Sequence, residues 1–236
     1  MQDIEFTPQQ HKTWAELYRR QEPKIRRHAS ALYLEGFDKL ELPADEIPTL
    51  DHLNSKIPAA SGWTVVRTDV RFTDADEWYQ FFDRKEFLIT NYMRSWEELD
   101  WTPEPDMFHD IFGHLPFFML PAYAELQEMF APAYLAAEND EEKETIKRLA
   151  WYSTEFGMIM EDGVMKVFGT GLMSGGDEFT NAAEGNLEYE AFTLENALGV
   201  DKVMYEQHDH LYVLDSLDQC KAELAKYLGP IAARAS

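Results

Sequence analysis

The chain has 236 residues, of which 45% are hydrophobic and 14% aromatic. That length and composition are sufficient for a substantial hydrophobic core, so we expect one globular domain. The formal net charge of −23 repels phosphate backbones and anionic lipid headgroups, so neither nucleic acid nor a membrane surface is an expected partner.

The compartment is predicted from cysteine content and from the start of the chain. Cys220 is the single cysteine, so no intramolecular disulfide is possible and nothing indicates an oxidising compartment. The segment from Met1 to Phe6 lacks the basic and apolar regions of a secretory signal, and no run of 18 apolar residues occurs. We therefore expect a cytoplasmic protein.

The first half of the chain is predicted to be mainly helical with two short strands. Thr7-Pro8 is typical of a helix start, and Pro23 is expected to interrupt that helix. A second helix is expected to end at Gly36. Further expected elements are a short helix over 49–57, a strand over 63–70, a helix over 74–82 and a strand over 87–93.

In the second half of the sequence, the pattern predicts one helix over 121–137 and another from 140 to the region of Glu155. A β-hairpin over 158–168 is expected to turn at Asp162-Gly163, and a glycine-rich loop to follow over 169–176. After a short strand over 211–214, the last helix is expected to start at Ser216 and end at Gly229-Pro230. The predicted fold class is mainly α with short β-strands.

Two histidines lie five residues apart, at His109 and His114. On an ideal α-helix this spacing is about 140° of rotation beyond a whole turn, so the two rings cannot share one helical face. They would converge on a metal if the backbone bends near Gly113 or if the metal lies beside the helix end. On spacing alone, structural or surface histidines are the more common explanation.

Glu155 lies in apolar surroundings, Trp-Tyr-Ser-Thr-Glu-Phe-Gly over residues 151–157. An unpaired carboxylate is costly to bury there, and a metal would satisfy it. Two histidines and one carboxylate form the ligand set of non-haem iron(II) enzymes that activate dioxygen. The ordinary explanation of Glu155 is a salt bridge to a lysine or arginine, or a partly exposed helix end, and spacing alone favours that explanation.

Three motifs resemble the tetrahydropterin-dependent aromatic amino acid hydroxylases, in their short bacterial form typified by phenylalanine 4-hydroxylase. They are Thr-Pro-Glu-Pro-Asp-Met-Phe-His-Asp-Ile-Phe-Gly-His-Leu-Pro over 102–116, the motif at 151–157, and Gly-Thr-Gly-Leu-Met-Ser over 169–174. The resemblance implies one catalytic domain over 1–236, without a regulatory domain or a tetramerisation helix, and we expect a monomer. It also implies iron(II), a tetrahydropterin and dioxygen as cofactor and cosubstrates, and hydroxylation of an aromatic amino acid ring, with phenylalanine as the expected substrate.

The same resemblance implies roles for ten side chains. Arg94 is expected to bind the substrate carboxylate, for which a guanidinium offers a bidentate fork. Without the resemblance, each of these residues has an ordinary explanation as a core, turn or surface residue. The full set comprises metal ligands His109, His114 and Glu155, substrate-binding residues Arg94, Thr102, Pro105, Trp151 and Ser174, and pterin-binding residues Asp110 and Trp78.

The chain departs from the family pattern at three positions. Ala150 stands where the family usually has tyrosine, Thr170 where it has alanine, and Gly175 where it has a second serine. Because these positions surround the substrate and pterin pockets, tryptophan is an alternative substrate. Two other classes also stay open: a zinc hydrolase that uses the same three ligands, and a non-enzymatic acidic interaction protein in which both histidines are core residues.

Overall fold

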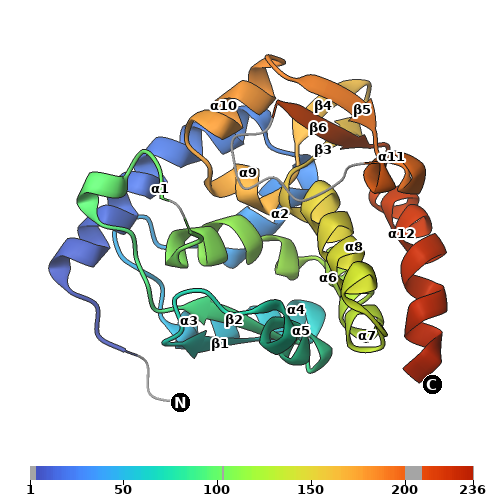
Figure 1. Ribbon diagram of the computed structural model, residues 1–236. Helices are drawn as coiled ribbons and strands as arrows, with labels where there is room; N and C mark the ends of the chain where they lie inside the picture. The colour runs from blue at the N-terminus through green and yellow to red at the C-terminus, as the bar shows by residue number, and fades with distance from the viewer. Residues whose placement is uncertain (1–3, 103, 200–208, 236) are drawn as a thin grey trace.

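The computed structural model describes residues 4–102, 104–199 and 209–235. Helices dominate and the strands are short, which confirms the predicted fold class (Figure 1). A continuous, aromatic-rich core connects the elements, and its largest fully buried side chains include Trp14, Trp63, Phe108 and Phe112.

The first helix is longer than predicted. In α1 (Pro8–His28), the Thr7 hydroxyl accepts from the Gln10 backbone N–H, as expected of a helix cap. The expected interruption at Pro23 is wrong, because the helix continues through it. Leu17 before the proline and Ile25 after it are both buried, so core packing on both sides offsets the lost hydrogen bond.

Gly36 lies inside α2 (Ala31–Leu40) and does not end it, so that prediction is also wrong. A Cβ atom at Gly36 would lie 1.9 Å from the Pro116 carbonyl oxygen. Glycine is therefore required for close packing of α2 against the chain before η3 (Phe117–Met119). The helix ends instead at Glu41, which has a left-handed conformation with φ 52°.

A small parallel sheet follows, formed by β1 (Thr64–Thr68) and β2 (Glu86–Thr90) with α5 (Ala75–Asp83) as the crossover. Both strands and α5 were predicted, with longer strand bounds. The Thr90 N–H at the end of β2 donates to the buried Asp110 carboxylate. The end of this sheet therefore lies against the segment that contains His109 and His114. The remaining short elements here are α3 (Leu50–Asn54), α4 (Ile57–Ser61) and η1 (Trp96–Glu98).

The central segment contains two π-helical turns, η2 (His109–His114) and η4 (Trp151–Glu155). The helix predicted over 121–137 is divided into α6 (Pro121–Gln127) and α7 (Phe130–Leu135). The next predicted helix is α8 (Asp140–Ala150), and η4 continues it as far as Glu155.

The second sheet has four strands in the order β4-β3-β6-β5. The predicted hairpin is present, with Asp162 at φ 50° and Gly163 at φ 79° in its turn. The glycine-rich loop predicted over 169–176 is wrong for most of its length, because it contains the helix α9 (Thr170–Ser174). The elements of this region are β3 (Gly157–Glu161), β4 (Val164–Val167), α10 (Asp177–Glu184), β5 (Glu188–Ala191), α11 (Leu194–Leu198) and β6 (His210–Leu214).

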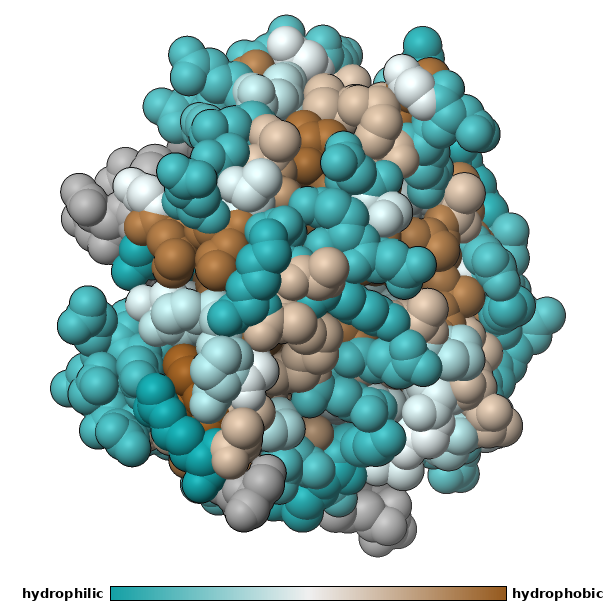
Figure 2. All heavy atoms as spheres, turned by 90° about the vertical axis from the view of Figure 1, so that its right-hand side faces the viewer, coloured by the Kyte–Doolittle hydropathy of each residue, from teal (hydrophilic) through white to brown (hydrophobic). Residues whose placement is uncertain are grey.

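The chain closes with α12 (Leu217–Ala232) and η5 (Ala233–Ala235). Ser216 caps α12 as predicted, but the expected end at Gly229-Pro230 is wrong, since buried Leu228 and Ile231 anchor the helix on both sides of the proline. The face shown in Figure 2 is mostly hydrophilic, with apolar residues in separate patches. Among the described residues, no helix has the length and apolar composition needed to span a membrane.

Candidate metal centre

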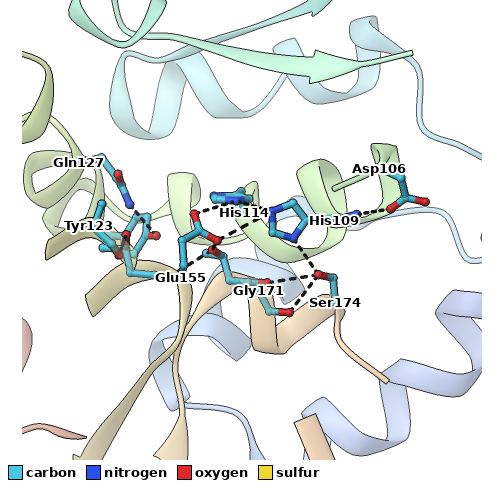
Figure 3. Close-up of polar contacts among 11 residues, drawn as sticks. Asp106, His109, His114, Tyr123, Gln127, Glu155, Gly171 and Ser174 are labelled. Atoms are coloured by element: carbon cyan, nitrogen blue, oxygen red, sulfur yellow. Dashed lines mark hydrogen bonds and ion pairs between the residues drawn. The ribbon is translucent and has the colours of Figure 1, made fainter. Parts of the chain in front are cut away.

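The two histidines of the sequence motif converge because their segment is π-helical. In η2 the hydrogen bonds run from residue i to i+5, so His109 and His114 lie one turn apart on the same face. Their Nε2 atoms are 3.0 Å apart (Figure 3). The sequence left open a bend near Gly113 or a metal beside the helix end, and the structure brings the rings together by the wider π-helical turn. Gly113 serves close packing instead, since a Cβ there would lie 2.6 Å from the Thr170 carbonyl oxygen.

Glu155 is the last residue of the second π-helical turn, in which the Phe156 N–H donates to the Trp151 carbonyl at 2.9 Å. Its Oε1 lies 3.3 Å from His114 Nε2, and its Oε2 lies 3.9 Å from His109 Nε2. Adjacent ligands of an octahedral ion with bonds of about 2.1 Å lie about 3 Å apart. The three side chains therefore fit one face of a metal's coordination octahedron.

The electrostatics of the three groups suit a cation. Burial lowers the pKa of His109 to about 4, assisted by repulsion from His114, and burial lowers the pKa of His114 to about 3. Both rings are neutral at pH 7 and can offer a lone pair. Burial raises the pKa of Glu155, although His109 and Thr170 act in the opposite direction. A bound metal ion would stabilise this carboxylate in its charged form.

Ser174 fixes the orientation of the His109 ring. Its Oγ lies 2.9 Å from His109 Nδ1, and 3.3 and 3.4 Å from the carbonyl oxygens of Gly171 and Thr170 (Figure 3). When the hydroxyl donates to a carbonyl, it accepts from the Nδ1–H group, which leaves the Nε2 lone pair directed at the centre. The resemblance implied that Ser174 binds the substrate, whereas in the structure its hydroxyl contacts His109, a candidate metal ligand.

We predict that Ser174→Ala weakens metal binding by about 10–100-fold, the usual effect of removing a partner of a liganding histidine. Titration of the metal-free protein with Co²⁺ against a chelator measures this affinity. Ser153→Ala is the matched control, because the Ser153 side chain is also buried but its hydroxyl donates to the Leu149 carbonyl. Equal Co²⁺ affinities in the two variants would remove Ser174 from this role.

Arg94 is connected to the centre through Asp106, a residue that the sequence analysis missed. Both side chains are buried, and Arg94 Nε and Nη2 donate to the two Asp106 oxygens at 2.8 and 2.9 Å. The Asp106 carboxylate also accepts from the Arg94 N–H and from the His109 N–H at the start of η2. Burial opposes ionisation, but Arg94 and these N–H groups bring the pKa of Asp106 below its usual value. An acidic residue three positions before His109 is a capping signal that could have revealed it.

Three other predicted substrate residues lie in the segments that carry the ligands. The Thr102 hydroxyl donates to the Glu104 carbonyl at 3.2 Å, and Pro105 is exposed. Trp151 is half-buried at the start of η4, with its ring 4.7 Å from that of Phe156. These contacts are local, so the structure places the three residues without testing their role.

The two predicted pterin residues lie on the β2 side of η2. Asp110 is buried and accepts from the Thr90 N–H at 2.8 Å, and burial raises its pKa well above the usual value. The Trp78 ring lies 5.3 Å from that of Phe87, whose ring is in turn 5.0 Å from that of His114. A chain of ring contacts therefore joins Trp78 to the candidate metal centre.

The sequence model of biopterin-dependent aromatic amino acid hydroxylases matches residues 1–234 of the chain. The chain belongs to this family. The hydroxylase is similar to phenylalanine-4-hydroxylase of Chromobacterium violaceum, with 34% identity over 173 residues, covering 73% of this chain and 58% of that enzyme. It is 33% identical over 222 residues to phenylalanine-4-hydroxylase of Mesorhizobium japonicum, covering 92% of this chain and 79% of that enzyme.

Solved structures agree with this assignment. The iron- and phenylalanine-bound phenylalanine hydroxylase of Chromobacterium violaceum has a TM-score of 0.87 and 28% identity, covering 97% of this chain and 83% of that chain. The enzyme from Legionella pneumophila has a TM-score of 0.90 and 26% identity, covering 98% and 92%. The predicted family and fold are confirmed, and the zinc hydrolase and non-enzymatic alternatives are not favoured.

Proposed function

We propose that this hydroxylase converts phenylalanine to tyrosine, with iron(II) held by His109, His114 and Glu155 and with a tetrahydropterin and dioxygen as cosubstrates. The observation that carries the proposal is the convergence of two neutral imidazoles and one carboxylate within 4.8 Å of one another. The related enzymes that are named phenylalanine-4-hydroxylase support the choice of substrate.

When bound, the iron and the tetrahydropterin supply the reactivity toward dioxygen, and the chain's own residues bind, orient and exclude water. The two imidazoles and the carboxylate would hold the ion from one side and would leave its remaining positions to other ligands. Phe87 packs its ring against His114, which keeps water from that side of the centre. No side-chain nucleophile is required.

Substrate and pterin occupy different sides of the centre in this proposal. Arg94 binds the amino acid carboxylate, and Asp106 holds the guanidinium in place. Thr102, Pro105 and Trp151 complete the substrate side, and Ser174 acts on it through His109. Asp110 and Trp78 are assigned to the pterin, which can stack on an aromatic face.

The direct test is a product assay. The iron-loaded protein is incubated with a tetrahydropterin and with phenylalanine, tryptophan or tyrosine, and the hydroxylated amino acid is identified. We expect tyrosine from phenylalanine as the main product. Hydroxylation of tryptophan in preference to phenylalanine would overturn the proposed substrate, and no hydroxylation of any of the three would overturn the proposed reaction.

We predict that Ala150→Tyr increases the preference for phenylalanine over tryptophan, because the larger side chain fills space that the larger ring of tryptophan would need. Ala150 is half-buried at the end of α8, directly before Trp151, so a small side chain there leaves room near the proposed ring pocket. A change in pocket volume alters selectivity by about 1–3 kcal/mol. Competition between the two amino acids gives the ratio of their kcat/KM values, and an unchanged ratio would exclude Ala150 from the pocket.

We also propose that the protein is a monomer and that it is located in the cytoplasm. Light scattering on the purified protein measures the mass in solution, and we expect that of one chain.

A further inference from the structure

Three positions depart from the family pattern, Ala150, Thr170 and Gly175. Of their side chains, that of Thr170 contacts a candidate metal ligand. It is fully buried at the start of α9, and its hydroxyl lies 2.8 Å from Glu155 Oε2 and 3.2 Å from the Thr154 carbonyl oxygen. A hydroxyl has one proton, and the shorter contact to the charged acceptor is the stronger of the two. The Thr170 hydroxyl therefore donates to one oxygen of Glu155.

The packing of α9 holds this donor in place. A Cβ atom at Gly113 would lie only 2.6 Å from the Thr170 carbonyl oxygen. The helices α9 and η2 are therefore in close contact. Glu155 reaches from η4 toward His114, and α9 runs beside it (Figure 3). The donor thus approaches the carboxylate from an element that cannot shift without disturbing the histidine segment.

The two carboxylate oxygens consequently differ. Oε2 is engaged by Thr170 and lies 3.9 Å from His109 Nε2, whereas Oε1 lies 3.3 Å from His114 Nε2. An oxygen that accepts a hydrogen bond is a weaker metal ligand and is held in the direction of its donor. Oε1, the oxygen that lies nearer to His114, is therefore the better placed of the two to bind a metal.

We infer that Thr170 is a positioning residue that makes Glu155 a one-oxygen ligand and keeps an additional coordination position open. The inference rests on the proposed metal site at His109, His114 and Glu155. An alanine at this position has no donor for Oε2, so both oxygens would be free to bind the ion. The departure from the family pattern at Thr170 then acts on the metal through Glu155.

The test uses Co²⁺ in place of iron, because its visible spectrum reports ligand exchange. Parent, Thr170→Val and Thr170→Ser proteins are loaded with Co²⁺ and titrated with azide, and the crystal structure of each loaded protein is determined. In the parent and in Thr170→Ser, we expect only Oε1 within about 2.2 Å of the metal. In Thr170→Val, we expect both oxygens to bind and azide affinity to fall by about tenfold, because Oε2 occupies a position that azide needs.

Thr154→Val is the matched control, since the Thr154 hydroxyl is equally buried beside Glu155 but donates to the Ala150 carbonyl. We expect parent-like azide binding in this variant. Two bound oxygens in the parent, or equal azide affinities in the parent and Thr170→Val, would overturn the inference while leaving the metal site intact. Absence of Co²⁺ from the three ligands in the parent would overturn the proposed function instead.

Discussion

Replacing Glu155 by glutamine or His114 by alanine is expected to lower the affinity for iron(II) by more than about 100-fold. A loss of about 10–100-fold is typical when only a residue that hydrogen-bonds to a metal ligand is changed. Each change removes one of the three donors that converge at the centre. Glutamine keeps the shape of Glu155 but not its charge, so the change isolates the electrostatic contribution. Binding is measured by titrating the metal-free variants with iron(II) under anaerobic conditions.

Folding and specificity are checked in the same experiment. The circular dichroism spectra and thermal midpoints of the metal-free variants are compared with those of the parent, and we expect folded proteins. His28→Ala is a suitable control, because His28 lies at the end of α1 with its ring against Phe179. A variant of Glu155 or His114 that holds iron and turns over like the parent would show that the ligand assignment is wrong.

The second large effect is expected at Arg94→Lys, which should raise the KM for the amino acid by tenfold or more (about 1.4 kcal/mol per tenfold). Lysine keeps the charge but cannot reproduce a bidentate contact. It also loses the two-point contact with buried Asp106, whose carboxylate accepts from the His109 N–H. We therefore expect lower thermal stability as well as weaker substrate binding.

Steady-state kinetics with phenylalanine separate these two effects. Arg84→Lys is the matched control, because Arg84 forms an ion pair with Glu86 at the surface, where such pairs contribute little. If Arg94→Lys has the parent's KM at a temperature where it is folded, Arg94 does not bind the substrate.

The residue types of the centre were predictable from sequence, but their geometry was not. Periodicity arguments place side chains by the rotation of an ideal α-helix, and on that basis His109 and His114 point apart. The π-helical turn that aligns them has no signal of its own in the residues. The same limit applies to Glu155, which was expected on an α-helix and lies on a second π-helical turn.

Prolines and glycines were the other source of error, because their roles depend on distant contacts. Pro23 and Pro230 each cost a helix hydrogen bond, yet buried neighbours on both sides keep α1 and α12 continuous. Gly36 was interpreted as a helix end, whereas it is required by the carbonyl of Pro116, which is remote in sequence. For Asp106, the spacing before His109 indicates only a helix cap, and its ion pair with Arg94 is visible only in the folded chain.

The proposed iron site is tested most directly by the dependence of tyrosine formation on bound iron. The metal-free protein is titrated with iron(II) under anaerobic conditions, then mixed with tetrahydropterin, phenylalanine and dioxygen, and the initial rate is recorded. We predict that the rate rises linearly and stops rising at one iron per chain, and that zinc loaded in place of iron gives no tyrosine. Tyrosine formation that is independent of iron, or supported equally by zinc, would contradict the account.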